Sequence, residues 1–304
     1  MKIHFTKMHG LGNDFILIDC REQTCPSGTA NLHNFSKRLC DRRFGIGADQ
    51  ILLLDRSGKA DFRMRIFNAD GSEVEMCGNG IRCLAMYIWK RRLSDKNILE
   101  IETLAGIMKP ERSGDLVKVD MGEPIFEPEK IPVTIHDDLN VHLAISNPPI
   151  PPLEKGGKGG FEGGGIIDYP LRIADREFKI TCVSMGNPHA VIVVDDVSDF
   201  PVTYYGPMIE THSIFPRKTN VEFIQVLNWA EIKMRVWERG SGETMACGTG
   251  ASAAAVASAL KGLTGTTVTV HLLGGDLLIE QAENRHIYMT GPAVKVFEGL
   301  ADIP

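Results

Sequence analysis

The sequence of 304 residues has no long hydrophobic run and no strong excess of charge. It contains no stretch of 18 apolar residues, so no transmembrane helix is expected. The net charge of -6 provides none of the positive field that nucleic-acid-binding proteins use. The first residues, MKIHFTKMHG, lack the charged-then-apolar pattern of a signal peptide. We therefore expect a cytoplasmic protein with neither a membrane nor a nucleic acid as its partner.

The seven cysteines are not spaced as in a disulfide framework or a zinc site. Their number is odd and no secretory signal precedes them, which argues against structural disulfides. No CxxC pair occurs, and no cysteine stands at zinc-like spacing from a histidine, so no metal site is expected. Most of the cysteines are predicted to be small buried hydrophobic side chains. The exceptions are Cys77 and Cys247, which belong to a repeated motif.

Short aliphatic and β-branched runs, separated by turn residues, predict many strands in antiparallel sheets. The predicted strands are 16–19, 50–54, 62–67, 98–102, 116–120, 190–195, 221–226, 232–237, 268–273 and 277–280. Two segments predict helices. Residues 77–93 place apolar side chains at helical spacing and end in three basic residues, which suit a helix C-terminus. Residues 248–260 are small on every side, which is typical of a buried helix.

The length of the chain suits two domains of about 150 residues each. Residues 147–165 consist mostly of glycine and proline and cannot bury a core. We interpret them as a surface insert within the second domain. The expected first domain is 1–122, with 293–304 returning to it, and the expected second domain is 123–292.

An internal repeat supports the two-domain interpretation. Residues 63–83, RMRIFNADGSEVEMCGNGIRC, align without a gap with residues 233–253, KMRVWERGSGETMACGTGASA, at an offset of 170. A weaker match pairs 12–19 with 186–193 at an offset of 174. The repeat predicts two similar domains related by a pseudo-twofold axis, with one cysteine from each facing a shared cleft.

Each repeated cysteine directly precedes a predicted helix. Unsatisfied backbone N–H groups and the helix dipole favour a thiolate there, so the thiol pKa is expected to fall below its usual value near 8.5. The glycines of CGNG (77–80) and CGTG (247–250) allow a ligand to approach the backbone closely. The exposed amides suit a carboxylate and could stabilise the negative charge that develops when a Cα proton leaves.

Two thiols on opposite faces of a Cα atom can invert its configuration. One thiolate removes the proton while the opposite thiol delivers another, and the roles exchange in the reverse direction. No lysine for a pyridoxal Schiff base is needed, so no cofactor is expected. The residues alone thus indicate proton transfer between Cys77 and Cys247.

Six sequence blocks resemble the signature motifs of the diaminopimelate epimerase family, in the family's order and over nearly the whole chain. They are MHGLGNDF (8–15), GIGADQ (45–50), RIFNADGSEVEMCGNGIRC (65–83), SMGNPH (184–189), ERGSGETMACGTGA (238–251) and YMTGPA (288–293). The segment 147–165 departs from the family pattern as an insertion and affects none of these motifs. The resemblance implies an α+β fold of two pseudo-symmetric domains, each a mostly antiparallel sheet wrapped around a central helix.

The resemblance also implies an activity, the interconversion of LL- and meso-diaminopimelate on the route to lysine and peptidoglycan precursors, carried out by a homodimer. It makes Cys77 and Cys247 the acid–base pair. The substrate-binding residues that it implies are Asn13, Gln50, Asn68, Gly78, Asn79, Asn187, Asn220, Glu238, Arg239, Gly248 and Thr249. The substrate carries two ammonium and two carboxylate groups, and each needs a partner in a site that excludes water. Arg239 can hold a carboxylate bidentately, and Glu238 can accept from an ammonium.

Some neighbouring residues allow a second interpretation. His189 either orients a substrate or a cysteine, or only holds its loop. Asp14 and Asp70 stand in turn-forming contexts, and local backbone capping is the preferred interpretation. Glu73 and Glu243 recur in the repeat and are assigned a structural role near the helix starts.

Three other functions would use some of the same residues. A related two-cysteine racemase acting on proline or hydroxyproline is the nearest, but Glu238, Arg239 and the many amide side chains favour a longer, doubly charged substrate. A thiol-redox protein would use Cys77 and Cys247 as a disulfide pair, yet each cysteine opens an anion-binding helix. A non-catalytic amino-acid binding module would explain a pocket but not the two cysteines.

Overall fold

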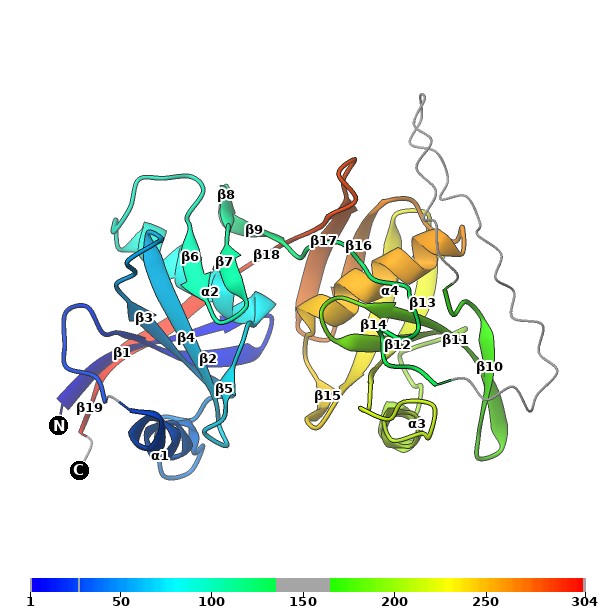
Figure 1. The fold of residues 1–304 in the computed structure, drawn as a ribbon, viewed down its shortest axis with the longest axis horizontal. Helices are drawn as coiled ribbons and strands as arrows, with labels where there is room; N and C mark the ends of the chain where they lie inside the picture. The colour runs from blue at the N-terminus through cyan, green and yellow to red at the C-terminus, as the bar shows by residue number, and fades with distance from the viewer. Residues whose placement is uncertain (1, 27, 135–164, 303–304) are drawn as a thin grey trace. The chain divides into compact units, whose positions relative to one another are not determined.

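The computed structural model describes residues 2–26, 28–134 and 165–302. The chain divides into two compact units, which are described one at a time (Figure 1). Unit 1 consists of Met1–Asp120 and Thr290–Pro304, and unit 2 consists of Met121–Met289. The predicted insert at 147–165 lies outside the described residues except for Gly165.

Unit 1 is built on an eight-stranded mixed sheet with mostly antiparallel pairs. Its strands are β1 (Lys2–Gly10), β2 (Asn13–Asp19), β3 (Gln50–Asp55), β4 (Phe62–Asn68), β5 (Glu73–Val74), β6 (Ile101–Thr103), β7 (Gly106–Met108) and β19 (Val294–Asp302). They follow the order β19-β1-β2-β3-β4-β6-β7, and β5 pairs with β4. Only the β2–β3 and β4–β6 pairs are parallel. The strands β8 (Glu111–Ser113) and β9 (Leu116–Asp120) form a hairpin that belongs to the second sheet, at its end next to β18.

Two helices pack against this sheet, α1 (Thr29–Cys40) and α2 (Gly78–Lys90). Alternate side chains of β3 are divided between them. Ile51 and Leu53 join the hydrophobic core that also contains side chains of α1. Leu52 points the other way and lies beneath the start of α2. The helix predicted over 77–93 is confirmed as α2, with Cys77 as its N-cap, but it ends at Lys90, three residues before the predicted end.

Unit 2 is built on a second mixed sheet. Its strands are β10 (Tyr169–Ile173), β11 (Arg176–Ser184), β12 (Pro188–Val193), β13 (Asn220–Asn228), β14 (Glu231–Glu238), β15 (Gly242–Thr244), β16 (Thr267–Leu272) and β17 (Gly275–Gln281), while β18 (Ile287–Gly291) spans the boundary of the units. The order is β10-β11-β12-β13-β14-β16-β17-β18, and β15 pairs with β14. Parallel pairs are β12–β13 and β14–β16.

The two sheets repeat one another strand by strand. The path β1-β2-β3-β4-β6-β7 of unit 1 and the path β11-β12-β13-β14-β16-β17 of unit 2 have the same sequence of parallel and antiparallel pairs. The register agrees too, since Ile51 pairs with Phe67 and Val221 pairs with Trp237, at the predicted offset of 170. The internal repeat is therefore a repeat of structure.

One ion pair occurs at the same place in both units. Arg65 on β4 binds Glu73 on β5 at 2.7 Å, and Arg235 on β14 binds Glu243 on β15 at 2.7 Å. Each ion pair joins the two strands that precede a cysteine in the chain. The predicted structural role of the two glutamates is confirmed.

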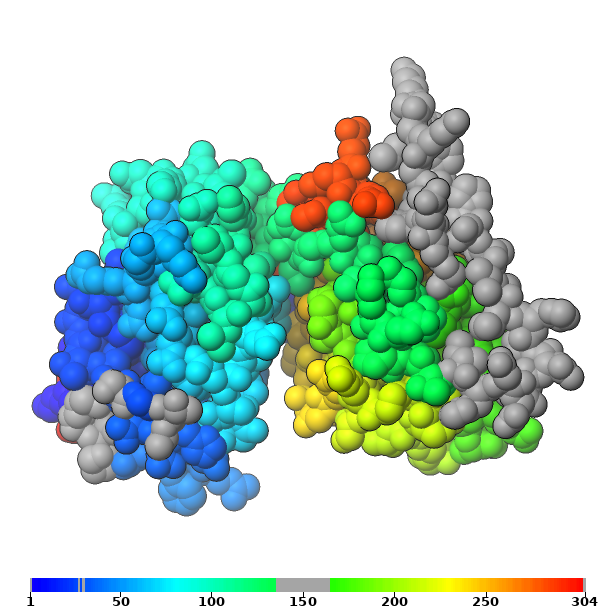
Figure 2. All heavy atoms as spheres, viewed as in Figure 1, coloured from blue at the N-terminus to red at the C-terminus, as the bar shows by residue number. Residues whose placement is uncertain are grey.

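The helices of unit 2 are α3 (Val202–Glu210) and α4 (Gly248–Leu260). Helix α4 begins and ends as predicted and is buried along nearly its whole length. Its small side chains allow β11–β14, β16 and β17 to contact it closely. In Figure 2, drawn from the same side as Figure 1, green atoms of the chain that follows β9 lie over much of α4. No helix within the described ranges is long and apolar enough to cross a membrane.

Helices α1 and α3 were not predicted from the sequence. Neither has a side chain that caps its N-terminus by a hydrogen bond. Helix α3 also contains Gly206 and Pro207, which usually end a helix. Tertiary packing requires this glycine, because a Cβ atom at position 206 would lie 2.6 Å from the Trp237 ring.

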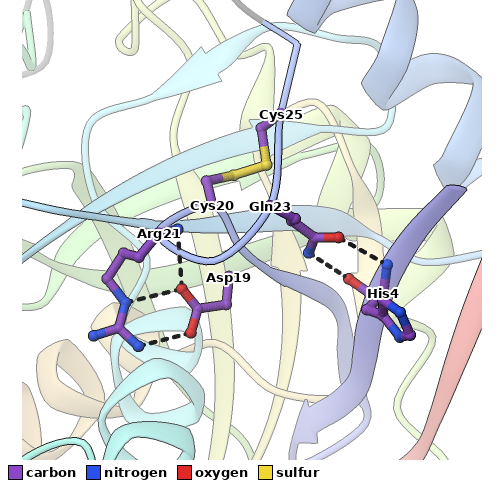
Figure 3. Close-up of a disulfide and its surroundings, with 6 residues drawn as sticks. All are labelled: His4, Asp19, Cys20, Arg21, Gln23 and Cys25. Carbon is purple, nitrogen blue, oxygen red and sulfur yellow. Dashed lines mark hydrogen bonds and ion pairs between the residues drawn. A yellow bond between two sulfur atoms is a disulfide. The ribbon is translucent and has the colours of Figure 1, made fainter. Parts of the chain in front are cut away.

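The expectation that no disulfide is present is wrong at one place. Cys20 and Cys25 are joined in the loop that follows β2 (Figure 3). The same loop is tied down by the Gln23 amide, which donates to and accepts from the backbone of His4 at 2.8 and 2.9 Å. Arg21 in turn makes two hydrogen bonds to the Asp19 carboxylate. The two cysteines are five positions apart in the chain, close enough for a local bridge, which the count of seven cysteines could not reveal. The other five cysteines are free, as predicted.

Candidate active site

Cys77 stands at the start of α2 with an extended backbone, and its Sγ atom accepts a hydrogen bond from the backbone N–H of Gly80 at 3.4 Å. Gly80 must be small, because a Cβ atom there would lie 3.1 Å from the Leu52 side chain and 3.4 Å from Cys77 Cβ. The predicted helix-start environment is thus present for the first thiol.

Amide side chains surround this thiol. The Asn13 Oδ1 atom lies 3.8 Å from Cys77 Sγ and accepts a hydrogen bond from Asn79 Nδ2 at 3.1 Å. Asn13 Nδ2 donates to the carboxylate of Asp49 at 2.9 Å, which fixes the orientation of the amide. Asp49 was not among the predicted residues, although it lies in the GIGADQ motif.

A buried arginine lies beneath the start of α2 and was also not predicted. Arg82 is fully buried and donates to Asn79 Oδ1 at 2.9 Å and to the Gly78 carbonyl at 3.3 Å. Burial lowers the pKa of this guanidinium, and the nearby cysteines act in the opposite direction. Position 82 corresponds in the repeat to Ser252, whose hydroxyl donates to the Gly248 carbonyl.

Gln50 and Asn68 lie side by side on neighbouring strands. Gln50 Nε2 donates to Asn68 Oδ1 at 2.7 Å, and Asn68 Nδ2 donates to Ser72 Oγ at 2.9 Å. The other amide atom of Gln50, Oε1, is buried and has no hydrogen-bond partner in the described part of the chain. It is an acceptor that a ligand ammonium could use.

Asp14 does more than cap the backbone. Its Oδ1 atom accepts from the backbone N–H of Asp49 at 2.9 Å, and its carboxylate also forms ion pairs with Lys7 and Arg42, each at 2.7 Å. Burial alone would raise the pKa of this carboxyl, but the hydrogen bonds from Arg42 and Lys7 lower it to about 2. Asp70, in contrast, accepts from the backbone and hydroxyl of Ser72, as a capping residue does.

The second thiol, Cys247, is buried at the start of α4. Its Sγ atom lies 3.5 Å from Thr249 Oγ1. Burial and the carboxylates of Glu238 and Glu222 raise the pKa of Cys247 well above its usual value, although Thr249 and a backbone amide act in the opposite direction. The expectation that the helix start lowers this pKa is therefore wrong for Cys247, because desolvation outweighs the helix dipole.

Glu238 adjoins this thiol at the end of β14. Its Oε1 atom accepts from Thr244 Oγ1 at 2.5 Å, and its carboxyl also hydrogen-bonds Cys247. Burial raises the pKa of Glu238, while Thr244 and Cys247 act in the opposite direction. In the repeat, Glu238 occupies the position of Asn68 in unit 1.

Behind Cys247 lies a hydrogen-bonded set of side chains. His189 Nδ1 is 2.7 Å from Glu222 Oε1, and His189 Nε2 is 2.9 Å from Asn187 Oδ1. Asn187 Nδ2 donates to Thr249 Oγ1 at 3.3 Å. Glu222 is the third residue that the sequence did not point to, although it directly follows Val221 in a predicted strand.

Asn220 and Arg239 complete the set of predicted residues. Asn220 Nδ2 donates to the Pro188 carbonyl, and Asn220 Oδ1 accepts from the backbone N–H of Arg239 at 3.0 Å. The Arg239 side chain is exposed and makes one hydrogen bond, from Nη1 to the Arg217 carbonyl at 3.2 Å. Its guanidinium can therefore still bind a carboxylate.

The predicted residues are thus divided between the units, with one thiol in each. Unit 1 brings together Asn13, Gln50, Asn68, Cys77, Gly78 and Asn79, and unit 2 brings together Asn187, His189, Asn220, Glu238, Arg239, Cys247, Gly248 and Thr249. Within the described ranges, no group of three or more His, Cys, Asp and Glu side chains could hold a metal ion.

Comparison with known proteins agrees with this arrangement. The family model described as diaminopimelate epimerase matches residues 5–127 and 181–296. The chain belongs to the diaminopimelate epimerase family. Curated proteins named diaminopimelate epimerase are 50% identical in Acetivibrio thermocellus, with 99% of each chain covered, and 51% identical in Pelotomaculum thermopropionicum, with 98% of each covered. The namesake from Methanococcus maripaludis is 48% identical, with 98% of this chain and 99% of that protein covered.

Solved structures share the fold at low sequence identity. A phenazine biosynthesis protein of the PhzF family from Bacillus anthracis superposes with a TM-score of 0.66, 18% identity and full coverage of both chains. A hydroxyproline epimerase from Agrobacterium vitis superposes with a TM-score of 0.64 and 13% identity, covering 98% of this chain and 92% of that one. At such identities the likeness extends to the fold alone. The predicted architecture of two pseudo-symmetric, sheet-rich domains is confirmed.

Proposed function

We propose that the protein is a cofactor-independent epimerase that interconverts LL- and meso-2,6-diaminopimelate. One observation carries the proposal: the repeat places a thiol at the start of a helix in each unit, Cys77 on α2 and Cys247 on α4. Membership of the diaminopimelate epimerase family supports the choice of substrate.

The chemistry requires no group beyond the two thiols. The thiolate of one cysteine takes the proton from Cα, so that a C–H bond breaks and an S–H bond forms. The other thiol then gives its proton to the opposite face of Cα. The enzyme ends with the two protonation states exchanged, which prepares it for the reverse direction. The backbone amides at Gly78–Asn79 and Gly248–Thr249 would hold the α-carboxylate and stabilise the carbanion.

The polar residues of each unit suit the charged groups of diaminopimelate. Buried Gln50 Oε1 and the Glu238 carboxyl are acceptors for ammonium groups. Arg239 is the donor suited to the distal carboxylate, which does not react. The finer assignment of individual contacts belongs to this proposal.

We further propose a cytoplasmic homodimer acting in lysine and peptidoglycan-precursor biosynthesis. The dimer would use β19, which lies at an edge of the unit 1 sheet and exposes apolar side chains. These are Val294, Val296, Phe297 and Leu300. A second copy covering this edge would remove both the apolar surface and the unpaired strand.

The decisive experiment is incubation of the pure protein with LL-diaminopimelate in D₂O. We expect meso-diaminopimelate to form with one deuterium at the inverted centre, after dialysis against a chelator and without added pyridoxal phosphate. Proline and hydroxyproline, tested in parallel, should not exchange their Cα protons. Exchange of proline but not of diaminopimelate would replace the proposal with a two-thiol proline racemase. Dependence on a metal ion or on pyridoxal phosphate would refute the two-thiol mechanism.

A further inference from the structure

The two units differ most sharply in the pair of side chains beneath the cysteine. In unit 1 the pair is apolar: Phe15 on β2 and Leu52 on β3 lie 3.5 and 3.1 Å from the place of a Cβ atom on Gly80. In unit 2 the corresponding strands carry His189 on β12 and Glu222 on β13. Glu222 Oε1 lies 2.8 Å from the place of a Cβ atom on Gly250. Both of these polar residues are fully buried.

The fold does not require a polar pair at this place. Unit 1 has the same strand order and register and uses two apolar side chains there. Burial of a histidine and a carboxylate costs desolvation energy that an apolar pair avoids. His189 and Glu222 must therefore contribute something other than stability.

The hydrogen bonds around His189 form a chain that ends at a thiol. Glu222 Oε1 and Asn187 Oδ1 are both acceptors and lie 2.7 and 2.9 Å from the two ring nitrogens. Asn187 Nδ2 donates to Thr249 Oγ1, so the Thr249 hydroxyl hydrogen remains for Cys247 Sγ, 3.5 Å away. In this direction Nε2 of His189 donates to the Asn187 oxygen.

If the hydrogen bonds ran in the opposite direction, Cys247 Sγ would lose the one that it accepts from Thr249. If Nε2 of His189 accepted instead, the Asn187 amide would have to turn its nitrogen toward the ring. Its oxygen would then accept from Thr249, and the Thr249 hydroxyl could no longer donate to Cys247. The direction of the His189 hydrogen bond is thus coupled, through two side chains, to a hydrogen bond on the sulfur.

We propose that Glu222 is a positioning residue that holds the His189 ring with its Nε2–H on Asn187 Oδ1 and thereby directs the Thr249 hydroxyl to donate to Cys247 Sγ. The inference rests on the proposed function, in which Cys247 must exist as a thiolate for one direction of the reaction. A donor is needed there because burial, Glu238 and Glu222 all disfavour the charged sulfur.

The other titratable groups around the pair come from each element packed against β12. They are Cys182 on β11, Glu238 on β14 and Cys247 at the start of α4. None of these groups can neutralise Glu222. Its second oxygen, Oε2, is buried without a hydrogen-bond partner in the described residues, so the contact of Oε1 with His189 fixes this carboxyl group.

The first test needs no substrate. Ring-nitrogen NMR of ¹⁵N-histidine-labelled protein should show a proton on Nε2 of His189 in the parent, with its signals assigned by their loss in His189→Phe. In Glu222→Gln, which keeps the shape and removes the charge, the ring-nitrogen signals of His189 should shift. An unchanged His189 signal in Glu222→Gln would overturn the proposal.

The second test is kinetic. Glu222→Gln should lower kcat by about 10- to 100-fold, as for carboxylates that orient other active-site histidines, and should change KM little. Its kcat should also depend differently on pH, which a purely structural role would not cause. Cys182→Ala is the matched control, since it alters the same buried region without touching the chain. Parental kcat and pH profile in Glu222→Gln would refute the positioning role.

A double variant separates function from folding. His189→Phe/Glu222→Leu gives unit 2 the pair that unit 1 already has, so it should fold and unfold at a temperature at least as high as the parent. Failure to fold would overturn the argument that the pair is dispensable for the fold. A parent that shows the expected His189 signals but does not epimerise diaminopimelate would refute the proposed function and leave the hydrogen-bond chain standing.

Discussion

The surroundings of Cys77 and Cys247 differ in charge although the two units share one fold. Near Cys77 lie the Asn13 and Asn79 amides and the buried guanidinium of Arg82. Near Cys247 lie the carboxyls of Glu238 and Glu222, together with Thr249 and His189. Comparing the two units therefore distinguishes the residues that the fold requires from the residues that the chemistry requires.

Features that both units share belong to the scaffold. They include the strand order, the arginine–glutamate pair and the glycine three residues after each cysteine. Features that differ between the units serve substrate recognition. A molecule with one reacting end and one end that is only recognised requires different binding partners for its two ends. The following experiments test this division, from the largest expected effect to the smallest.

The thiols should show the largest effect and the same effect in both units. Cys77→Ala and Cys247→Ala should each lower epimerisation by more than about 100-fold, because each removes a group that transfers the proton. Turnover of LL-diaminopimelate, followed by chiral chromatography, is the measurement. Cys40→Ala is the control, since Cys40 is buried and free in the core of unit 1. If Cys40→Ala lost as much epimerase activity, the losses in the Cys77 and Cys247 variants would be attributed to folding.

Substitution of Arg239 should have an effect with no counterpart in unit 1, since the repeat places Ala69 at the equivalent position. Arg239→Lys should lower kcat/KM for diaminopimelate at least about tenfold, because an ammonium cannot form the planar fork that matches a carboxylate. Arg217→Lys, in the neighbouring loop, should keep parental kcat/KM. Lysine, which lacks the distal carboxylate, should be a very poor substrate for the parent. Comparable turnover of lysine and diaminopimelate would contradict this assignment of Arg239.

The shared ion pair should affect stability equally in the two units. Glu73→Gln and Glu243→Gln should each lower the free energy of unfolding by about 1 to 2 kcal/mol, because each leaves a half-buried arginine with a weaker acceptor. Urea unfolding measures both. If the losses of unfolding free energy in the two variants differed by more than about 1 kcal/mol, the two ion pairs would not be equivalent parts of one scaffold.

Glu238 should show a small effect on stability that depends on pH. Its pKa is raised in the folded state by burial, so the folded protein binds this proton more tightly than the unfolded chain does. Stability is therefore lost as the pH rises above the unfolded value of 4.5. Glu238→Gln should unfold at a higher temperature than the parent at about pH 8, and the difference should shrink toward about pH 4.

A matched control for Glu238 exists in unit 1. Asn68→Gln changes the equivalent position without adding or removing a titratable group, so its effect on the unfolding temperature should not vary with pH. A pH-independent gain in Glu238→Gln would mean that packing rather than ionisation is responsible.

Much of the candidate site was predictable from local patterns. The two copies of Cys-Gly-x-Gly, each before a run of apolar or small residues, indicated helix starts, and α2 and α4 begin there. Helices α1 and α3 were missed because their local signals are weak: α3 contains Gly206 and Pro207 and is held by packing against the sheet. The Cys20–Cys25 bridge was missed because a count of cysteines carries no information on which of them meet.

The amino-acid sequence by itself determined the repeat, its offset of 170 residues, the two cysteines at helix starts and the family. These follow from residue types at fixed spacing along the chain. Only the tertiary structure decided that Arg82 lies beneath one helix start and Glu222 beneath the other, and that the pKa of Cys247 is raised rather than lowered. The physical reason is that desolvation and charge act through space. Strand pairing places Glu222 beside His189, which lies 33 positions away in the chain. A pattern of neighbouring residues cannot predict such a contact.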